Sequence, residues 1–102
     1  MEREYIVEWF RFADMDFSSA EFLQGMSPQP FEIICYHCQQ SVEKNLKGYL
    51  IEKGIEPPKT HDLVDLNDMC SDIDKRFSEN DKICGILYSH TETFGMNVRG
   101  FL

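Results

Sequence analysis

The chain is 102 residues long, which is enough for one domain with one modest hydrophobic core. Ten Lys and Arg against eighteen Asp and Glu give a net charge of −8, which argues against wholesale phosphate binding because that needs many basic side chains. Apolar residues make up 42% of the chain, so it is expected to fold, and no apolar run is long enough to span a membrane.

The first predicted element is a helix over residues 3–24, where apolar side chains recur at helical spacing. Its apolar stripe consists of Tyr5, Ile6, Trp9, Ala13, Ala20 and Leu23, with Phe17 at the edge. Asp16 falls inside this stripe, and a buried carboxylate must be paired or hydrogen-bonded. We therefore expect Asp16 to contact Lys44, His61 or His90 and to lock two helices together. An acid–base couple in a cleft is the alternative.

A break at GMSPQP separates this helix from a second one over residues 30–53, which ends at Gly54. The apolar stripe of the second helix comprises Phe31, Ile34, Cys35, Cys38, Val42, Leu46 and Tyr49. The spacing of Cys35 and Cys38 suggests a zinc or redox site, but both thiols lie within the stripe and His37 points about 100° away. Cys70 and Cys84 are isolated in the sequence, so we predict reduced cysteines that pack in the core, without a metal or cofactor.

The other side of the second helix carries a polar stripe at spacings of four, three and four residues. It comprises Tyr36, Gln40, Glu43 and Lys47, and His37 and Lys44 flank it. The simpler interpretation is a solvated face with an i,i+4 ion pair between Glu43 and Lys47. An aromatic side chain is unusual on such a face, so the second interpretation is a surface that contacts another helix or another subunit.

Two shorter helices are predicted after the stiff connector IEPPKT. Thr60 or Asp62 is suited to cap the third helix, whose apolar residues are Leu63, Leu66, Met69, Cys70 and Ile73. The polar stretch SENDK leads into the fourth helix, which carries Ile83, Ile86, Leu87, Phe94 and Val98, with His90 on the same stripe. No useful strand alternation is present. The prediction is an all-α, up-and-down bundle of four to five helices, with the first two in a long antiparallel hairpin.

Three motifs, in matching order and spacing over about residues 5–102, resemble the HEPN domain family. Trp9, Ala13, Asp16 and Ala20 fit W-x3-A-x2-D-x3-A, and residues 36–47 fit aromatic-His-x-Gln-Gln-x-x-Glu-Lys-x-x-Lys. Residues 60–63, THDL, match the family's Thr-His-Asp-Leu step. The resemblance implies one helical domain over residues 1–102. Arg99 opens Arg-Gly-Phe where the family often has Arg-Tyr-Pro, and the expected domain lacks the family's last short helix.

HEPN domains often dimerise, and many are encoded beside or fused to minimal nucleotidyltransferases. The resemblance implies an interaction module, a homodimer that partners a nucleotidyltransferase protein or engages a nucleotide or RNA. The N-terminal stretch lacks the pattern of a signal peptide, so a cytoplasmic location is expected. The candidate nucleotide-binding, phosphate-binding or interface residues are Tyr36, His37, Gln40, Glu43, Lys44, Lys47 and Arg99. The expected structural polar residues are Asp16, His61, Asp62 and His90.

Ribonuclease members of this superfamily carry an Arg followed, after four to six residues, by a His. None of His37, His61 and His90 has an Arg at that distance, so we expect no catalytic residues. The alternative is an RNA-cleaving, toxin-like ribonuclease, which needs a general base and a cation for the developing phosphorane charge. In that alternative, His37 or His61 would act beside Lys44.

Overall fold

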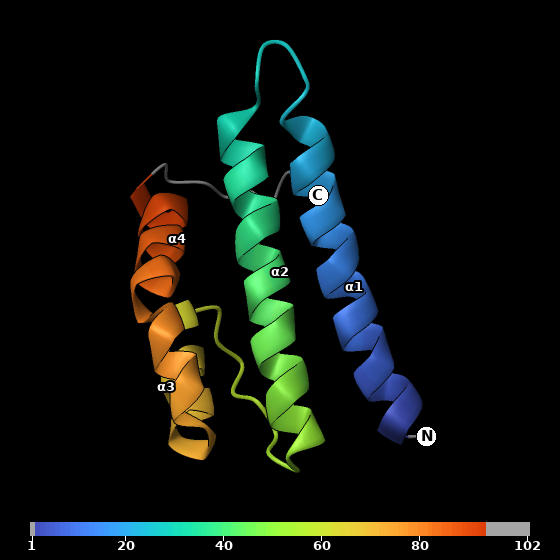
Figure 1. Ribbon diagram of the computed structural model, residues 1–102, viewed down its shortest axis with the longest axis vertical. Coiled ribbons are helices and arrows are strands. Elements are labelled where there is room, and N and C mark those ends of the chain that lie inside the picture. The colour runs from blue at the N-terminus through green and yellow to red at the C-terminus, as the bar shows by residue number, and fades with distance from the viewer. Residues whose placement is uncertain (1, 94–102) are drawn as a thin grey trace.

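The helices α1 (Glu2–Leu23) and α2 (Phe31–Glu52) form a long antiparallel hairpin along one side of the molecule (Figure 1). The computed structural model describes residues 2–93. On the other side of α2 lie α3 (Leu63–Ile73) and α4 (Asp81–Thr93), joined by the 3-10 helix η1 (Lys75–Asn80). The predicted all-α bundle and its hairpin are confirmed. Within residues 2–93, no helix combines the length and the apolar character that crossing a membrane requires.

Small side chains let α1 lie close against α2. Ala13 and Ala20 of α1 are 0% and 5% exposed. A Cβ atom added to Gly48 of α2 would lie only 3.0 Å from the Phe10 ring, so a side chain at this position would require the ring to shift. The Ser41 hydroxyl of α2 donates a hydrogen bond of 2.8 Å to the Ala13 carbonyl oxygen. These contacts fix the position of the polar side chains that the two helices bring together.

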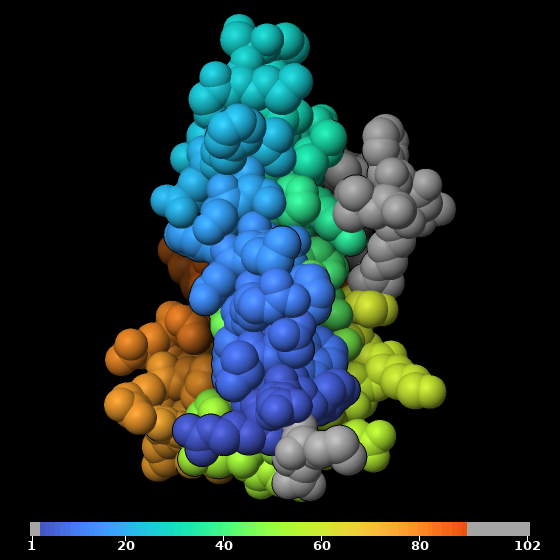
Figure 2. Space-filling model, turned by 90° about the vertical axis from the view of Figure 1, so that its right-hand side faces the viewer, coloured from blue at the N-terminus to red at the C-terminus, as the bar shows by residue number. Residues whose placement is uncertain are grey.

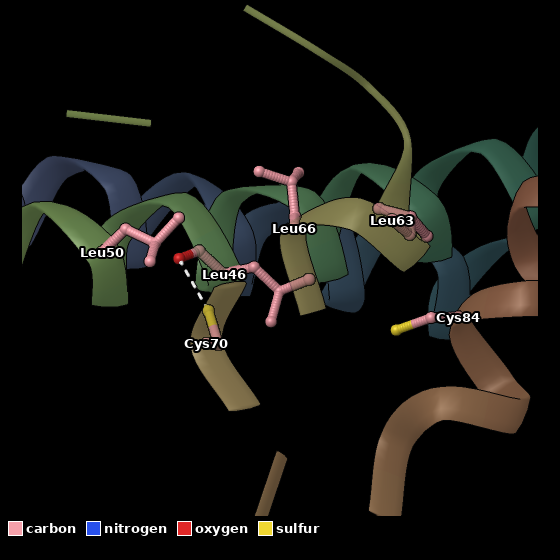
Figure 3. Packing of buried hydrophobic residues seen from close by; sticks show 6 residues of the cluster. All are labelled: Leu46, Leu50, Leu63, Leu66, Cys70 and Cys84. Atoms are coloured by element: carbon pink, nitrogen blue, oxygen red, sulfur yellow. Dashed lines mark hydrogen bonds between the residues drawn. The ribbon is translucent and has the colours of Figure 1, made fainter. Parts of the chain in front are cut away.

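The largest group of buried apolar residues joins α2, α3 and α4 (Figure 3). It consists of Leu46, Leu50, Leu63, Leu66, Cys70 and Cys84. The Cys70 thiol also donates to the Leu46 carbonyl oxygen, with 3.6 Å between sulfur and oxygen. Burial of these side chains removes apolar surface from water, the main source of folding free energy. It holds α3 and α4 on the side of α2 opposite α1.

The ends of two helices follow the sequence prediction. Asp62 caps α3, because its carboxylate accepts from the backbone N–H groups of Val64 at 2.9 Å and Asp65 at 3.2 Å. The Thr60 hydroxyl accepts from the Asp62 N–H at 3.1 Å, so both candidate residues contribute to the turn. Gly54 follows α2 with φ of +79°, a conformation that favours glycine.

The structure differs from the prediction in the fourth helix. Part of the polar stretch before it forms η1. Ile83 and Ile86, expected in the core, are 49% and 43% exposed, whereas Cys84 is fully buried. The side of α4 that faces α2 and α3 is set by Cys84, with Leu87 packed against the same cluster. The expected apolar residues Phe94 and Val98 lie outside the described residues.

Three aromatic residues of the predicted stripes are more exposed than expected. Tyr5, Phe17 and Phe31 expose 56%, 50% and 46% of their surface. Tyr5 and Phe17 lie on α1, which packs mainly on α2, so only a narrow strip of α1 is covered. Phe31 is the first residue of α2, at the end of that helix. Residues at the edge of a periodic stripe then remain in contact with solvent.

Candidate functional site

The polar residues of the three sequence motifs meet in two clusters along α2. The first polar cluster comprises Asp16, His37 and Lys44, between α1 and α2. The second polar cluster comprises Glu43, Lys47 and His61, between α2 and the segment that enters α3. In each cluster one carboxylate contacts both a lysine and a histidine. The two clusters are therefore the candidate site of this molecule.

In the first polar cluster, Asp16 uses both carboxylate oxygens. Its Oδ1 lies 2.9 Å from Nδ1 of His37, and its Oδ2 accepts a hydrogen bond from the Lys44 ammonium group. The Asp16 side chain is only 13% exposed, so water competes little for these contacts. Because an ionised carboxylate only accepts, Nδ1 of His37 is the donor and Nε2 is the nitrogen left for other groups. Lys44 also lies 5.8 Å from the centre of the Phe12 ring.

In the second polar cluster, a single carboxylate oxygen of Glu43 contacts both Lys47 and His61. Oε2 accepts from Lys47 at 3.0 Å and lies 2.8 Å from Nδ1 of His61. The other oxygen, Oε1, is buried without a hydrogen-bond partner. The side chains of Glu43 and Lys47 are 7% and 10% exposed, and that of His61 is 48% exposed. Gln39 adds a weaker contact, from its amide nitrogen to the His61 carbonyl oxygen at 3.4 Å.

A shallow groove opens beside the first polar cluster. It has a volume of about 530 Å³ and is lined by Ser18, Ser19, Phe22, Leu23 and His37. Phe22 is 83% exposed at this groove, the most exposed of the large apolar side chains described. His37 of the first polar cluster is one of the side chains that line this groove.

The structure confirms Lys44 as a partner of the buried Asp16. His61, another expected partner, instead contacts Glu43, and His37 contacts Asp16, which was not predicted. The signal was present in the spacing: His37 and Lys44 are seven residues apart, so they share one side of α2. The side chain of His90 lies outside the described part of the molecule.

The polar stripe of α2 is largely buried rather than solvated. Tyr36, Glu43 and Lys47 are 9%, 5% and 8% exposed, and Gln40 is partly buried. The Tyr36 ring meets the His37 ring edge-on, with 5.6 Å between their centres. The expected i,i+4 pair between Glu43 and Lys47 exists, but it lies inside the bundle. The roles of these residues in binding stay predictions, and Arg99 lies outside the described residues.

All four cysteines are free thiols. Burial raises the pKa of the Cys70 and Cys84 thiols to about 11, and it also raises the pKa of Cys35 and Cys38. A high pKa keeps a thiol protonated at neutral pH, so it is a poor metal ligand and nucleophile. Among the described residues, no three His, Cys, Asp or Glu side chains are grouped so as to hold a metal ion.

Comparison with known proteins gives one result. The sequence model of the HEPN domain family matches residues 6–94, a range that includes both polar clusters and every helix from α1 to α4 apart from the first residues of α1. No curated protein and no solved structure matches the chain. The match extends over most of the 102 residues, and the helical bundle agrees with it. The chain therefore belongs to the HEPN domain family.

Proposed function

We propose that this protein is a helical binding and interaction module, a homodimer that engages a nucleotidyltransferase protein or a nucleotide and does not cleave RNA. The observation that carries the proposal is the pairing of charges inside the chain. Lys44 contacts Asp16, and Lys47 contacts Glu43. RNA cleavage needs a cation free to stabilise developing negative charge, and both lysines of the family motif already face a carboxylate.

Burial favours a protein partner over a nucleotide. A base would need an open aromatic face for stacking, and Tyr36 is only 9% exposed. A phosphate at Lys47 would have to displace Glu43 from a side chain that is 10% exposed. Lys44, whose side chain is 26% exposed, is the better placed of the two lysines for a phosphate. We take the protein-partner role first and the nucleotide role second.

The proposal extends to the organisation and location of the protein. We treat residues 1–102 as one domain, because α2 contacts α1, α3 and α4 and so connects all four helices. We place this domain in the cytoplasm, where reduced cysteines are the normal state. The four free thiols are consistent with this location.

RNA cleavage remains the second candidate, and one observation favours it. Asp16 holds the His37 ring through Nδ1, and the same ring lines an open groove beside Ser18. A carboxylate that orients a histidine is a common arrangement for a general base. Lys44, the lysine of this cluster, is not free to serve as the cation, because it contacts the same Asp16 carboxylate. We therefore rank cleavage below the interaction module.

Light scattering and an RNA incubation test the proposal together. The purified chain has a mass of 12.0 kDa, so a dimer is expected at twice that mass. Incubation with a mixed single-stranded RNA is expected to leave the RNA intact. Calorimetry with ATP tests the nucleotide role. RNA cleavage by the wild type that His37→Ala abolishes would overturn the proposal in favour of the ribonuclease.

A further inference from the structure

One side of α1 carries large apolar side chains that are about half exposed or more among the described residues, with Lys44 of α2 near the Phe12 ring and His37 of α2 near Phe22. Phe12, Met15 and Phe22 are 44%, 52% and 83% exposed. With Ser19 they follow spacings of three, four and three residues, which place all four within about 80° of the helix circumference. We call these four residues the α1 stripe. The buried Ala13 and Ala20 lie about 130° away around the helix. In Figure 2, α1 runs over the front of the molecule, so its outer side faces solvent.

The area of the α1 stripe fits a subunit interface. A buried aromatic side chain covers about 150–250 Å², so the exposed parts of Phe12, Met15 and Phe22 add up to roughly 350 Å² of apolar surface. An interface of standard size buries about 800 Å² on each partner, of which roughly 450 Å² is nonpolar. Three side chains thus supply most of the nonpolar area that one partner contributes.

The same surface presents both a projection and a recess. Phe22 projects at the edge of the groove formed with Ser18, Ser19, Leu23 and His37. A twofold axis brings the same surface of two molecules together, so a side chain that projects beside a recess can enter the same recess of the identical partner. A side chain beside a groove of about 530 Å³ provides both features within one chain.

Charge also favours a second copy of the chain. Two molecules of net charge −8 repel each other, so a surface without net charge favours their contact. The α1 stripe contains no charged residue. Beside it, Glu8 and Arg11 neutralise each other in an ion pair of 2.8 Å. The exposed Asp14 and Glu21 lie on a different side of α1 from the stripe.

We infer that a second copy of this chain packs along the α1 stripe, with Phe22 of each molecule seated in the groove of the other. The inference rests on the homodimer of the proposed function and names its contact surface. Spacings of three and four residues are those with which two helices interdigitate at a shallow crossing angle. The His37 ring, held by Asp16, then becomes one wall of the recess that receives the partner's aromatic ring.

Sedimentation equilibrium of wild type, Phe22→Ser and Phe17→Ser tests this inference. Phe17→Ser is the matched control, because Phe17 is a half-exposed phenylalanine of the same helix on a different side. Phe22→Ser is expected to raise the dimer dissociation constant by about tenfold to a hundredfold, as for the loss of an aromatic anchor. Phe17→Ser is expected to leave that constant within about threefold of wild type. Circular dichroism must show unchanged helix content in both variants.

Two outcomes overturn the inference, and they differ in what else they affect. A wild-type dimer that Phe22→Ser leaves equally stable places the interface elsewhere, while the proposed homodimer stands. A wild type that is monomeric at every concentration removes both the interface and the proposed homodimer. Met15 provides a second readout, since peroxide should oxidise its thioether more slowly at concentrations where the dimer forms. An oxidation rate that does not depend on protein concentration contradicts the inference.

Discussion

Oδ1 of Asp16, in α1, lies 2.9 Å from Nδ1 of His37, in α2. The other oxygen of the same carboxylate accepts a hydrogen bond from Lys44, about two helical turns further along α2 than His37. One acidic side chain on the first helix thus determines how two basic groups of the second helix are oriented. Most of the Asp16 side chain is shielded from solvent, which makes its replacement a sensitive test of this contact.

Asp16→Ala is expected to lower the free energy of unfolding by about 2 kcal/mol, because it leaves two donors without their acceptor. Asp14→Ala is the control: Asp14 is exposed on the same helix, and its loss should change little. Chemical denaturation of the three proteins measures the difference. Equal stability of both variants would mean that Asp16 is solvated in the folded protein.

In the second polar cluster, we expect a substitution to lower the free energy of unfolding more than Asp16→Ala does. Glu43→Gln removes a buried negative charge that faces Lys47 and is expected to cost about 3 kcal/mol, because the lysine is then buried without a counter-charge. His61→Ala removes the other partner of Glu43. The His61 side chain is about half exposed, so its loss should lower the free energy of unfolding less, by about 1 kcal/mol. Denaturant titration ranks the two variants. A greater loss for His61→Ala would contradict the burial seen at Glu43.

Gly48 predicts the effect of a single added methyl group. A Cβ atom at this position would lie 3.0 Å and 3.1 Å from two atoms of the Phe10 ring and 3.2 Å from Cβ of Trp9. Gly48→Ala should therefore push α1 away from α2 and destabilise the protein by about 1–2 kcal/mol. Thermal unfolding followed by circular dichroism measures the change.

Gly85→Ala is the matched control for this change. Gly85 lies within α4, and an added Cβ atom would meet no atom of the described residues within 4 Å. The substitution should stabilise the helix by about 0.5–1 kcal/mol, since alanine loses less conformational entropy than glycine. We therefore expect the free energy of unfolding to fall in Gly48→Ala and to rise in Gly85→Ala. Stabilisation by Gly48→Ala would show that the two helices are further apart than the structure places them.

The buried thiols predict a dependence of stability on pH. Burial raises the pKa of Cys70 and Cys84 from 9.0 to about 11, so the unfolded chain loses these protons at lower pH than the folded chain does. The stabilisation that the two protonated thiols contribute to the folded state is complete below about pH 9 and is lost between about pH 9 and pH 11. The free energy of unfolding, measured from denaturation curves, should decline less over this pH range in Cys70→Ala than in wild type. The same decline in both proteins would assign it to other groups.

Reactivity gives an independent check of the cysteines. At neutral pH the folded protein should react slowly with iodoacetamide, because protonated thiols are poor nucleophiles. Cys38 is the least buried of the four and should react first, which mass spectrometry of the peptides can resolve. In denaturant all four should react quickly. Fast modification of Cys70 in the folded protein would contradict its burial.

Periodicity predicted the helices and the hairpin, because α1 and α2 are long and each has one clear apolar stripe. It also identified Asp16 as a paired residue and Asp62 as a cap, since both depend on local position. It missed the contact between Asp16 and His37, because the wheel of one helix does not show where its neighbour crosses. It misplaced Ile83 and Ile86 for the same reason: the packed side of a short helix depends on its neighbours.

The central claim is that the polar residues matching the HEPN motifs hold the helices of this chain together. A double-mutant cycle between Asp16 and Lys44 tests this claim most directly. Wild type, Asp16→Ala, Lys44→Ala and the double variant are unfolded in denaturant under identical conditions. The exposed pair of Glu8 and Arg11 is the control and should show little coupling. The account predicts a coupling free energy of about 1–2 kcal/mol between Asp16 and Lys44. Effects of the two substitutions that add up within about 0.5 kcal/mol would contradict it.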